Sequence, residues 1–328
     1  MKRLTIVVVV AALVYSGFWF WNAQTQKSAI NGWFEDRRLA GWTAEFTDLE
    51  VKGFPNRLDT TISSPRIGAP SSGPQWEAPF FQIFRLTYNP SHLIVVAANE
   101  QTLSTPDTEI GVITTDLRAS LEMADLATWT PERLILVSEG LEISATSGWA
   151  LNADVAQIST EIAEGNTYRV GLDARNLTGS LAGNANAPTN QTPLDRLLLD
   201  ANLSFSAPIN RHTLEQRRPQ LENLALNLAE AEWNGFKLAA AGMLEVSPSG
   251  TLNGQIILKL RNWRDIVEKE RGQNRLSQNA LNQIELTLGL ISGLSGNPET
   301  LDLPFDFKNG QIWLGPLNLG KAPNLQIP

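Results

Sequence analysis

The first apolar feature of the chain is an uncharged run from Leu4 to Trp21. As a helix at 1.5 Å per residue, this run is about 27 Å long, close to the roughly 30 Å hydrocarbon core of a bilayer. It closes with the aromatic residues 18–21, which are of the kind that settle at the boundary between membrane and water. Lys2 and Arg3 precede it, and such charges stay on the cytoplasmic side. The pattern predicts a transmembrane anchor at 1–22, with the remainder outside the cytoplasm.

A cleaved secretory signal is the alternative explanation of the same run. Such signals have an apolar core of about 7 to 15 residues, followed by a cleavage site of small residues. The only tolerable site here is 14–16, before Gly17, and it lies inside apolar sequence that continues to Trp21. We therefore favour the uncleaved anchor over a soluble mature protein.

Residues 23–41 have the pattern of a juxtamembrane helix that is polar on most sides. Its apolar residues form a limited stripe at helical spacing around Phe34, and Gly41 ends it. From Trp42 to Thr47 apolar and polar residues alternate instead, as they do in a half-buried strand. We expect a β domain over 42–328.

Short alternating runs, separated by turn-rich stretches, recur through the middle of the chain without helices between them. This arrangement is typical of an antiparallel meander of hairpins. The fold class predicted is mainly β (α+β), with an extended curved antiparallel sheet. The runs are 82–88, 92–98, 109–121, 133–137, 140–144, 151–158, 168–177 and 197–205.

Hairpin registers can be derived from the sequence at two places. In the pair 236–246 and 251–260, the large apolar residues are mostly even-numbered in both strands. If the numbers of directly opposite residues add up to an even number, all of these apolar residues lie on one face. Near the C-terminus, Asn309-Gly310 is the preferred dipeptide of a two-residue type I′ turn. That turn would pair residue 307 with 312 and residue 305 with 314, and all four are apolar.

Between these two hairpins, apolar residues recur about every 3.6 residues, as they do along one face of a helix. Two amphipathic helices are predicted, near 262–272 and 275–294. We expect them to cover one face or end of the sheet; the alternative is a mobile lid.

Composition excludes some classes of partner and of site. The net charge of −8 and the pI of about 5.0 argue against a nucleic-acid surface. The absence of cysteine excludes disulfides, thiolate metal sites and cysteine nucleophiles. His92 and His212 are the only histidines, and neither stands in a ligand or catalytic pattern. We assign no catalytic, cofactor-binding or metal-ligating residue, and we expect a non-enzymatic protein without a cofactor.

Residues of turns and strands carry a resemblance to a known family. They are Gly53, Phe54, Pro55, Arg57 and Asp59 near the start of the β region, and Gly310, Gly315 and Pro316 in the segment FKNGQIWLGP. With them the chain resembles the bacterial family of unknown function numbered 2125, over nearly its whole length. The resemblance implies a single-pass protein of the bacterial inner membrane with its C-terminal domain in the periplasm. More distantly, the anchor, the many strands and the terminal hairpin resemble AsmA-type proteins, which are implicated in envelope lipid transport.

From the residues themselves, Arg57 and Asp59 lie two apart on a strand and so share a face, where they can pair. An anionic ligand at Arg57 is the alternative.

The function expected is set by the apolar side of the sheet. That side must be buried against another sheet, the helices, its own curled edge or an acyl chain. The candidate residues of a hydrophobic groove are Leu197, Leu199, Leu203, Phe205, Phe236, Leu238, Leu244, Ile256, Leu258 and Leu260. If the sheet stays open, these residues bind or pass lipids or other hydrophobic molecules; if it closes, they form an ordinary core.

Two other functions stay open at this point. One is a scaffold or assembly factor that contacts envelope proteins, for example by strand addition. The other is an enzyme built from dispersed carboxylates.

Overall fold

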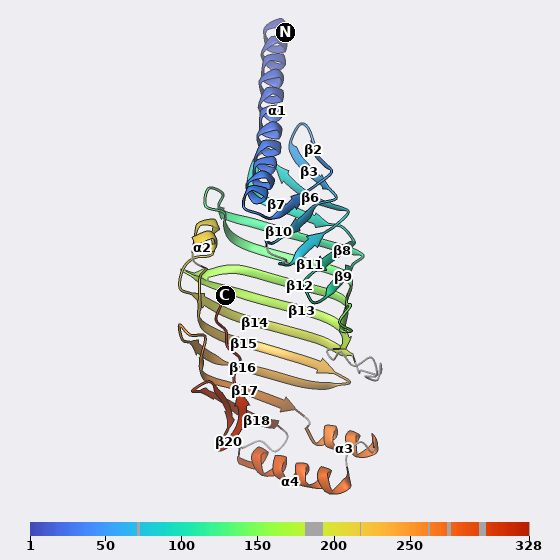
Figure 1. Cartoon of the computed structure of the whole chain (residues 1–328), viewed down its shortest axis with the longest axis vertical. Coiled ribbons are helices and arrows are strands. Elements are labelled where there is room, and N and C mark those ends of the chain that lie inside the picture. Colours follow the sequence, from blue (N-terminus) through green and yellow to red (C-terminus); the bar gives the residue numbers. More distant parts are fainter. Residues whose placement is uncertain are drawn as a thin grey trace. The chain divides into compact units, whose positions relative to one another are not determined.

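The computed structural model describes residues 1–70, 73–180, 193–216, 218–261, 263–273, 277–294 and 300–327. The chain is mainly antiparallel β, with a long apolar N-terminal helix and an open curved sheet (Figure 1), so the predicted fold class is confirmed. It divides into two compact units. Unit 1 comprises Met1–Leu126, Glu132–Ala153 and Gly179–Thr189, and unit 2 comprises Ala127–Pro131, Asp154–Thr178 and Asn190–Pro328.

Unit 1 contains the N-terminal helix and the shorter strands. The elements are α1 (Lys2–Leu39), β1 (Thr43–Glu45), β2 (Asp48–Lys52), β3 (Arg57–Ser63), β4 (Arg66–Gly68), β5 (Gln75–Glu77), β6 (Phe80–Leu86), β7 (Asn89–Ala97), β8 (Glu100–Ser104), β9 (Glu109–Ile113) and β10 (Asp116–Asp125). Two long strands, β11 (Thr130–Ala145) and β12 (Ala150–Glu164), have parts in both units.

The strands of unit 1 form two antiparallel ladders. One runs β2-β3-β6-β7-β10, and the other runs β1-β4-β5-β8-β9-β11. The chain passes from one ladder to the other within a few residues, so pairs such as β3 and β4 are the halves of one bent strand. Small or cyclic residues are buried at these bends: Pro65, Ala78, Ala98 and Thr114. This explains why the run 109–121, predicted as one strand, is divided into β9 and β10.

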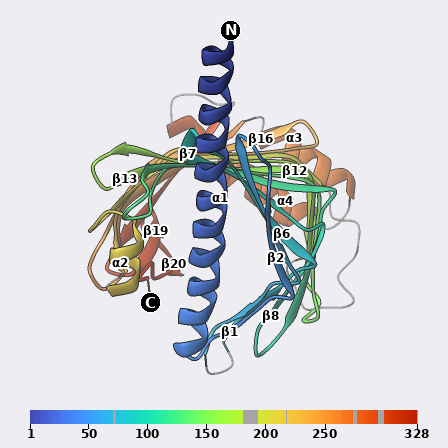
Figure 2. The same cartoon turned by 90° about the horizontal axis from the view of Figure 1, so that it is seen from above.

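Helix α1 packs along β3 over its C-terminal half. Figure 2 shows the C-terminal end of the helix beside β1. Trp19 and Ala23 contact Leu58, and Phe34 contacts Ile62 farther along the strand. The Nε1–H of Trp19 donates a 2.7 Å hydrogen bond to the carbonyl oxygen of Arg57. Because the helix is continuous from Lys2 to Leu39, the apolar run and the sheet of unit 1 are joined by one rigid element.

Unit 2 is built from long strands in sequential order. They are β13 (Thr167–Ser180), whose last residues belong to unit 1, β14 (Leu194–Phe205), β15 (Leu221–Trp233), β16 (Phe236–Val246), β17 (Leu252–Arg261), β18 (Thr300–Lys308), β19 (Gln311–Leu314) and β20 (Leu317–Lys321). Each pairs antiparallel with the next, and Figure 1 shows β13 to β17 as successive rungs. The helices are α2 (Arg211–Gln216), α3 (Trp263–Gln273) and α4 (Gln278–Leu294).

The two derived hairpin registers are confirmed. Leu238 lies opposite Leu260 and Ala240 opposite Leu258, which gives the even sum. Phe305 lies opposite Leu314 and Phe307 opposite Ile312. Asn309 and Gly310 have φ of 54° and 69°, as a type I′ turn requires at both central positions.

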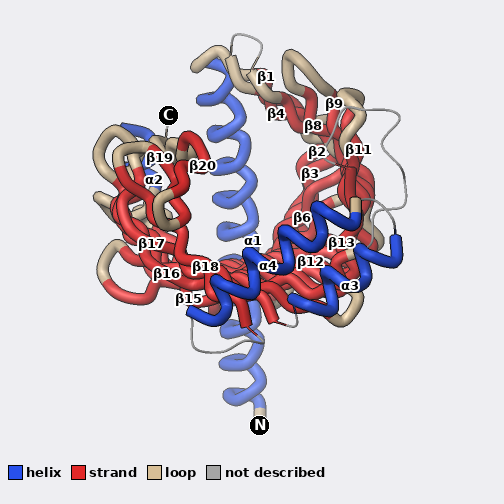
Figure 3. Tube along the Cα trace, turned by 90° about the horizontal axis from the view of Figure 1, so that it is seen from below, coloured by secondary structure: helices blue, strands red, loops and turns tan. Residues whose placement is uncertain are grey.

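Helices α3 and α4 lie side by side and cover one end of the β17–β18 pair (Figure 3). Trp263, Val267 and Leu281 bury Leu301 between them. The predicted helices near 262–272 and 275–294 correspond to these elements, except that residues 262, 275 and 276 lie outside the described residues.

A first prediction concerns the packing of α1. Phe34 is 2 % exposed, so Phe34→Ala leaves a cavity and should destabilise unit 1 by about 3–5 kcal/mol. Leu39→Ala, on the same helix but 82 % exposed, should change stability by less than about 0.5 kcal/mol. Hydrogen exchange of the full-length protein, compared between the ladders of unit 1 and unit 2, measures both effects. Equal protection of β3 in the two variants would contradict the packing described.

Candidate functional site

The main candidate site is one face of the sheet in unit 2, here called the apolar face. Residues directly opposite each other on neighbouring strands point to the same side of a sheet. Three rows of such partners cross the strands. They are Ala174-Leu197-Ala231-Leu238-Leu260-Leu301, Leu172-Leu199-Ala229-Ala240-Leu258-Leu303 and Tyr168-Leu203-Leu224-Leu244-Gly254-Phe307.

The structure brings the predicted groove residues together on this face. Most of those on β14, β16 and β17 fall into the three rows. Ile256, opposite Gly242, lies between two rows, and Phe205, opposite Leu221, lies just beyond the third. Phe236 ends the face opposite Trp233. The sequence pattern did not predict β15, the strand between the groove residues of β14 and those of β16 and β17. A bulge between Leu226 and Ala229 interrupts the alternation of apolar and polar residues in this strand.

Most of the apolar face is only half-buried. Leu197, Leu199 and Leu203 are all intermediate in exposure, and so are Ile256 and Leu258. Leucine at such positions in a closed core would be almost fully inaccessible. Within the described residues of unit 2, the strands form a single antiparallel series with no second sheet of the unit packed on the face, and α3 and α4 pack at only one end of it.

The size of the side chains varies across the face. The middle strands β15 and β16 carry Ala229, Ala231, Ala240 and Gly242 between leucines at their ends, whereas leucine and isoleucine occupy the corresponding positions of the flanking strands β14 and β17. Short side chains bounded by long ones leave room on an apolar surface, and such surfaces accept hydrophobic ligands.

The two ends of the strands are covered differently. At the end near Leu260 and Leu301, the cover is provided by α3 and α4. At the other end, Leu325 of the C-terminal segment packs against the buried cluster of Leu244 and its neighbours. The centre of the face therefore lies between two protein walls.

Charged side chains are concentrated on the opposite face. Arg169 donates two 2.9 Å hydrogen bonds to Asp200. Arg196 bonds Asp173 in the same way, at 3.0 and 2.8 Å. Farther along, Lys237 pairs with Glu230 and Glu232, and Lys259 pairs with Asp302. With these ion pairs on one face and the apolar rows on the other, the sheet of unit 2 has one solvated side and one apolar side.

The pairs shift the ionisation of their members in the expected direction. The hydrogen bonds from Arg196 hold the pKa of Asp173 below its ordinary value of 3.8. Those from Arg169 do the same to the pKa of Asp200. Both groups are solvent-accessible, so each pair contributes modestly to stability.

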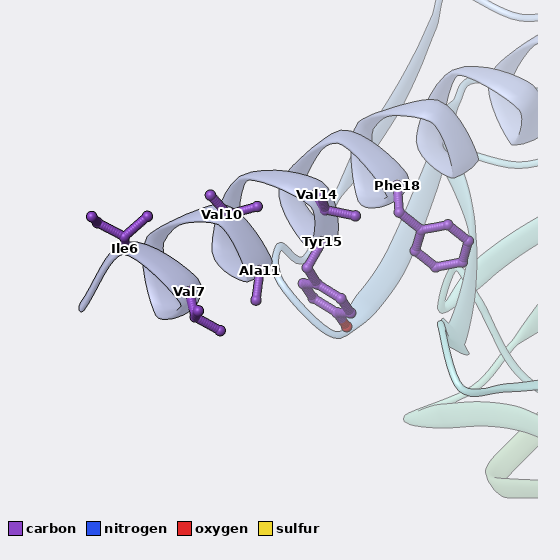
Figure 4. A pocket seen from close by; sticks show the side chains of 7 residues that line it. All are labelled: Ile6, Val7, Val10, Ala11, Val14, Tyr15 and Phe18. Carbon is purple, nitrogen blue, oxygen red and sulfur yellow. The ribbon is translucent and has the colours of Figure 1, made fainter. Parts of the chain in front are cut away.

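Two hollows in unit 1 are weaker candidates. The first, of about 660 Å³, runs along one side of α1 and is lined by apolar-run residues from Ile6 to Phe18 (Figure 4). It is an exposed apolar flank of the helix, which is the surface that a lipid-facing helix presents. The second, of about 630 Å³, lies at the bend between the ladders; there Arg66 is already paired with Glu77.

The histidines and carboxylates do not assemble a metal site in the described residues. His92 is hydrogen-bonded to Ser120 through Nε2 at 2.8 Å and lies opposite Glu122. His212 lies in α2.

The motif residues occupy turns, except for Arg57 and Asp59, which lie in β3. Gly53 has φ of 105°, and a Cβ there would lie 2.9 Å from both the Cβ and the carbonyl oxygen of Arg57, so the β2–β3 turn requires glycine. Arg57 pairs with Asp59 through hydrogen bonds of 3.0 and 2.6 Å, as their spacing predicts. In the C-terminal hairpins, Gly310 and Gly315 have positive φ, and Pro316 follows in the β19–β20 turn.

A second prediction follows from the charged face. Since the folded pKa of Asp173 and Asp200 lies below the unfolded value, their stabilisation is present above about pH 4 and is lost as pH falls through the folded pKa. Asp173→Asn with Asp200→Asn should therefore lower the stability of unit 2 at pH 7 by about 1 kcal/mol and flatten its acid dependence. Asp107→Asn, in the β8–β9 turn, is the control. Urea unfolding between pH 7 and pH 2.5 is the measurement, and an unchanged acid dependence would contradict the assignment.

Comparison with known proteins identifies a family to which the chain belongs. No curated protein and no solved structure matches the chain. The family described as "Uncharacterized protein conserved in bacteria (DUF2125)" matches residues 19–323, so the match covers α1 from Trp19 together with the strands of both units. The chain therefore belongs to this bacterial family, DUF2125.

Proposed function

We propose that this protein is a non-enzymatic, membrane-anchored envelope protein whose apolar face binds or passes lipids or other hydrophobic molecules. The observation that carries the proposal is the apolar face of unit 2, which continues across six strands and stays half-exposed at its centre. Extended apolar surfaces are rare on monomeric proteins and mark sites of interaction.

The dimensions of the face suit an acyl chain. Five spacings of about 4.8 Å separate β13 from β18, so the rows are about 24 Å long. One leaflet of a bilayer core is about 15 Å thick, which is the length that an acyl chain covers. Each methylene buried on such a surface contributes about 0.8 kcal/mol.

The anchor supports the location. Helix α1 is long and apolar enough to span a membrane, and 6 % of its apolar window is buried against the protein. With Lys2 and Arg3 on the cytoplasmic side, the sheet faces the periplasm from the inner membrane. The distant resemblance of the terminal hairpin to AsmA-type proteins agrees with a role in lipid handling.

A charge placed on the apolar face tests the proposal. Leu258→Lys should reduce copurifying lipid, or binding of a fluorescent fatty acid, at least tenfold, because an unpaired ammonium on an apolar surface opposes an acyl chain. Ile257→Lys is the matched control: it is the adjacent residue on the opposite face, is 36 % exposed, and should bind as the unchanged protein does. Native mass spectrometry after gentle extraction gives the lipid stoichiometry.

Equal lipid loss in the two variants would contradict binding at the apolar face, as would an unchanged protein that is lipid-free. A fold check by circular dichroism separates either result from misfolding.

A scaffold function is the second candidate. Its specific support is β20, where Leu317 and Leu319 are 58 % and 48 % exposed on a strand paired on one side with β19. Exposed edges of this kind accept a strand from a partner. Lipid-free protein that copurifies with a stable envelope partner, and loses it on Leu319→Lys, is the result that would favour the scaffold.

A further inference from the structure

Two hairpin turns of unit 1 extend along α1 toward its N-terminus. The turn between β2 and β3 places Phe54 against α1, with its ring centroid 5.5 Å from that of Trp19 and 6.1 Å from that of Phe20. The turn between β6 and β7 reaches farther: the Oγ1 of Thr87 lies 3.3 Å from the hydroxyl of Tyr15. Figure 4 shows Tyr15 beside a turn of the sheet.

The turns are also joined to each other. Thr87 donates hydrogen bonds to the carbonyl oxygen of Asn56 from its backbone N–H, at 3.0 Å, and from its hydroxyl, at 3.2 Å. They form one tip, which we define as residues 53–56 and 87–88.

Along the axis of α1, the tip lies beside the last residues of the apolar run Leu4–Trp21. Tyr15 lies six residues before Trp21, where the run ends, and six residues of helix measure about 9 Å. The interfacial region outside each side of the hydrocarbon core is about 5–8 Å thick. If Leu4–Trp21 spans the core, Trp21 lies at the edge of the core, and the tip reaches from near that edge, at Phe54, to about 9 Å inside it, at Thr87, which is the depth of the first methylenes.

The exposed side chains of the tip fit that depth. Phe54 is 52 % and Tyr88 72 % exposed, and on the adjoining helix Phe20 and Trp21 are 63 % and 65 % exposed. Exposed aromatic residues gathered around a membrane helix are typical of the interface.

Beside the tip lies a cation that has no ion-pair partner among the described residues. Arg85, two residues before Thr87, pairs in register with Leu58 and Leu93, so it shares the side of the sheet on which α1 packs. Its Nε is buried without a hydrogen-bond partner, and within the described residues no carboxylate pairs with it. Burial lowers the pKa of Arg85, which remains a cation. By contrast, Arg57 on the other face is satisfied by Asp59.

Leu58 contacts Trp19 and Ala23, so Arg85 lies level with the last turn of the apolar run. Lipid phosphates occupy this level of a bilayer, and a guanidinium binds phosphate through two parallel hydrogen bonds.

We infer that the tip inserts into the interface of the leaflet that α1 enters last, and that Arg85 binds the phosphate of a membrane phospholipid there. The inference rests on the membrane anchoring proposed above, and it is independent of lipid binding by unit 2. It gives the segment Gly53-Phe54-Pro55 a role in membrane contact that its turn geometry alone does not supply.

Insertion is tested with single cysteines, since the chain contains none of its own. Full-length Val10→Cys, Asn56→Cys, Tyr88→Cys and Asp107→Cys carry an environment-sensitive fluorophore in phospholipid nanodiscs that contain lipids with a quencher on the acyl chain. The labels at 10, 56 and 88 should be quenched, and the label at 107, on a distant turn of unit 1, should not.

Labels at 56 and 88 that behave like the one at 107, while Val10→Cys is quenched, would overturn insertion and leave the anchor intact. A label at 10 that escapes quenching would overturn both.

The phosphate contact is tested in the Leu258→Lys background, which removes lipid from unit 2. Arg85→Gln should retain a phosphatidylglycerol about tenfold less than the parent in native mass spectrometry, and Arg85→Lys should retain it to an intermediate degree. Arg66→Gln, which removes the arginine of an exposed pair, should match the parent. Diacylglycerol with the same chains should not distinguish the variants.

Equal retention of phosphatidylglycerol by the Arg85 and Arg66 variants would overturn the phosphate contact. Binding of inorganic phosphate as tight as that of the lipid, lost in Arg85→Gln, would overturn its assignment to a membrane lipid.

Discussion

The structure depends on keeping apolar and charged residues on opposite sides of long strands through many successive pairings. A slip of one residue would exchange the two sides of a strand, so every hairpin of unit 2 must hold its register. The Asn309-Gly310 turn does so through its two positive φ angles. On β15 the bulge after Leu226 moves the apolar side from even to odd positions, and the rows continue through Ala229 without a break. The bidentate Arg169–Asp200 pair supports the same register from the charged side.

Helix α1 combines two environments in one continuous element. Before Trp19 its side chains are exposed on nearly all sides, and after that residue one stripe is buried on β3. The same helix that is suited to a bilayer thus provides the cover for the first ladder of unit 1. The buried Trp19, with its hydrogen bond to the Arg57 carbonyl, marks the change between the two environments.

The parts of the fold that depend on neighbouring residues in the sequence could be predicted from the pattern of apolar and polar residues. The anchor-like run, the alternation of β16 and β17 and the Asn-Gly turn depend on neighbouring residues, and so does the pairing of Arg57 with Asp59. The parts that sequence reasoning missed depend on distant contacts. The bulge hid β15, and the sharp bends of unit 1 at residues such as Thr114 divided single runs into strands of two ladders. That Arg85 has no ion-pair partner among the described residues depends on its cross-strand neighbours Leu58 and Leu93, which lie 27 and 8 residues away in the sequence.

The last residues of the chain close unit 2. The segment after β20 bonds to the turn at Gly310 through Ala322, to the β16–β17 turn through Leu325 and Asn324, and to Gln220 through Ile327, at 2.7–3.1 Å. Gly250 must be glycine for this, because a Cβ would overlap Asn324. The ribosome synthesises these residues after every strand that they fasten. The strands of unit 1 can therefore pair before the segment after β20 has been made, whereas the far wall of the apolar face requires that segment.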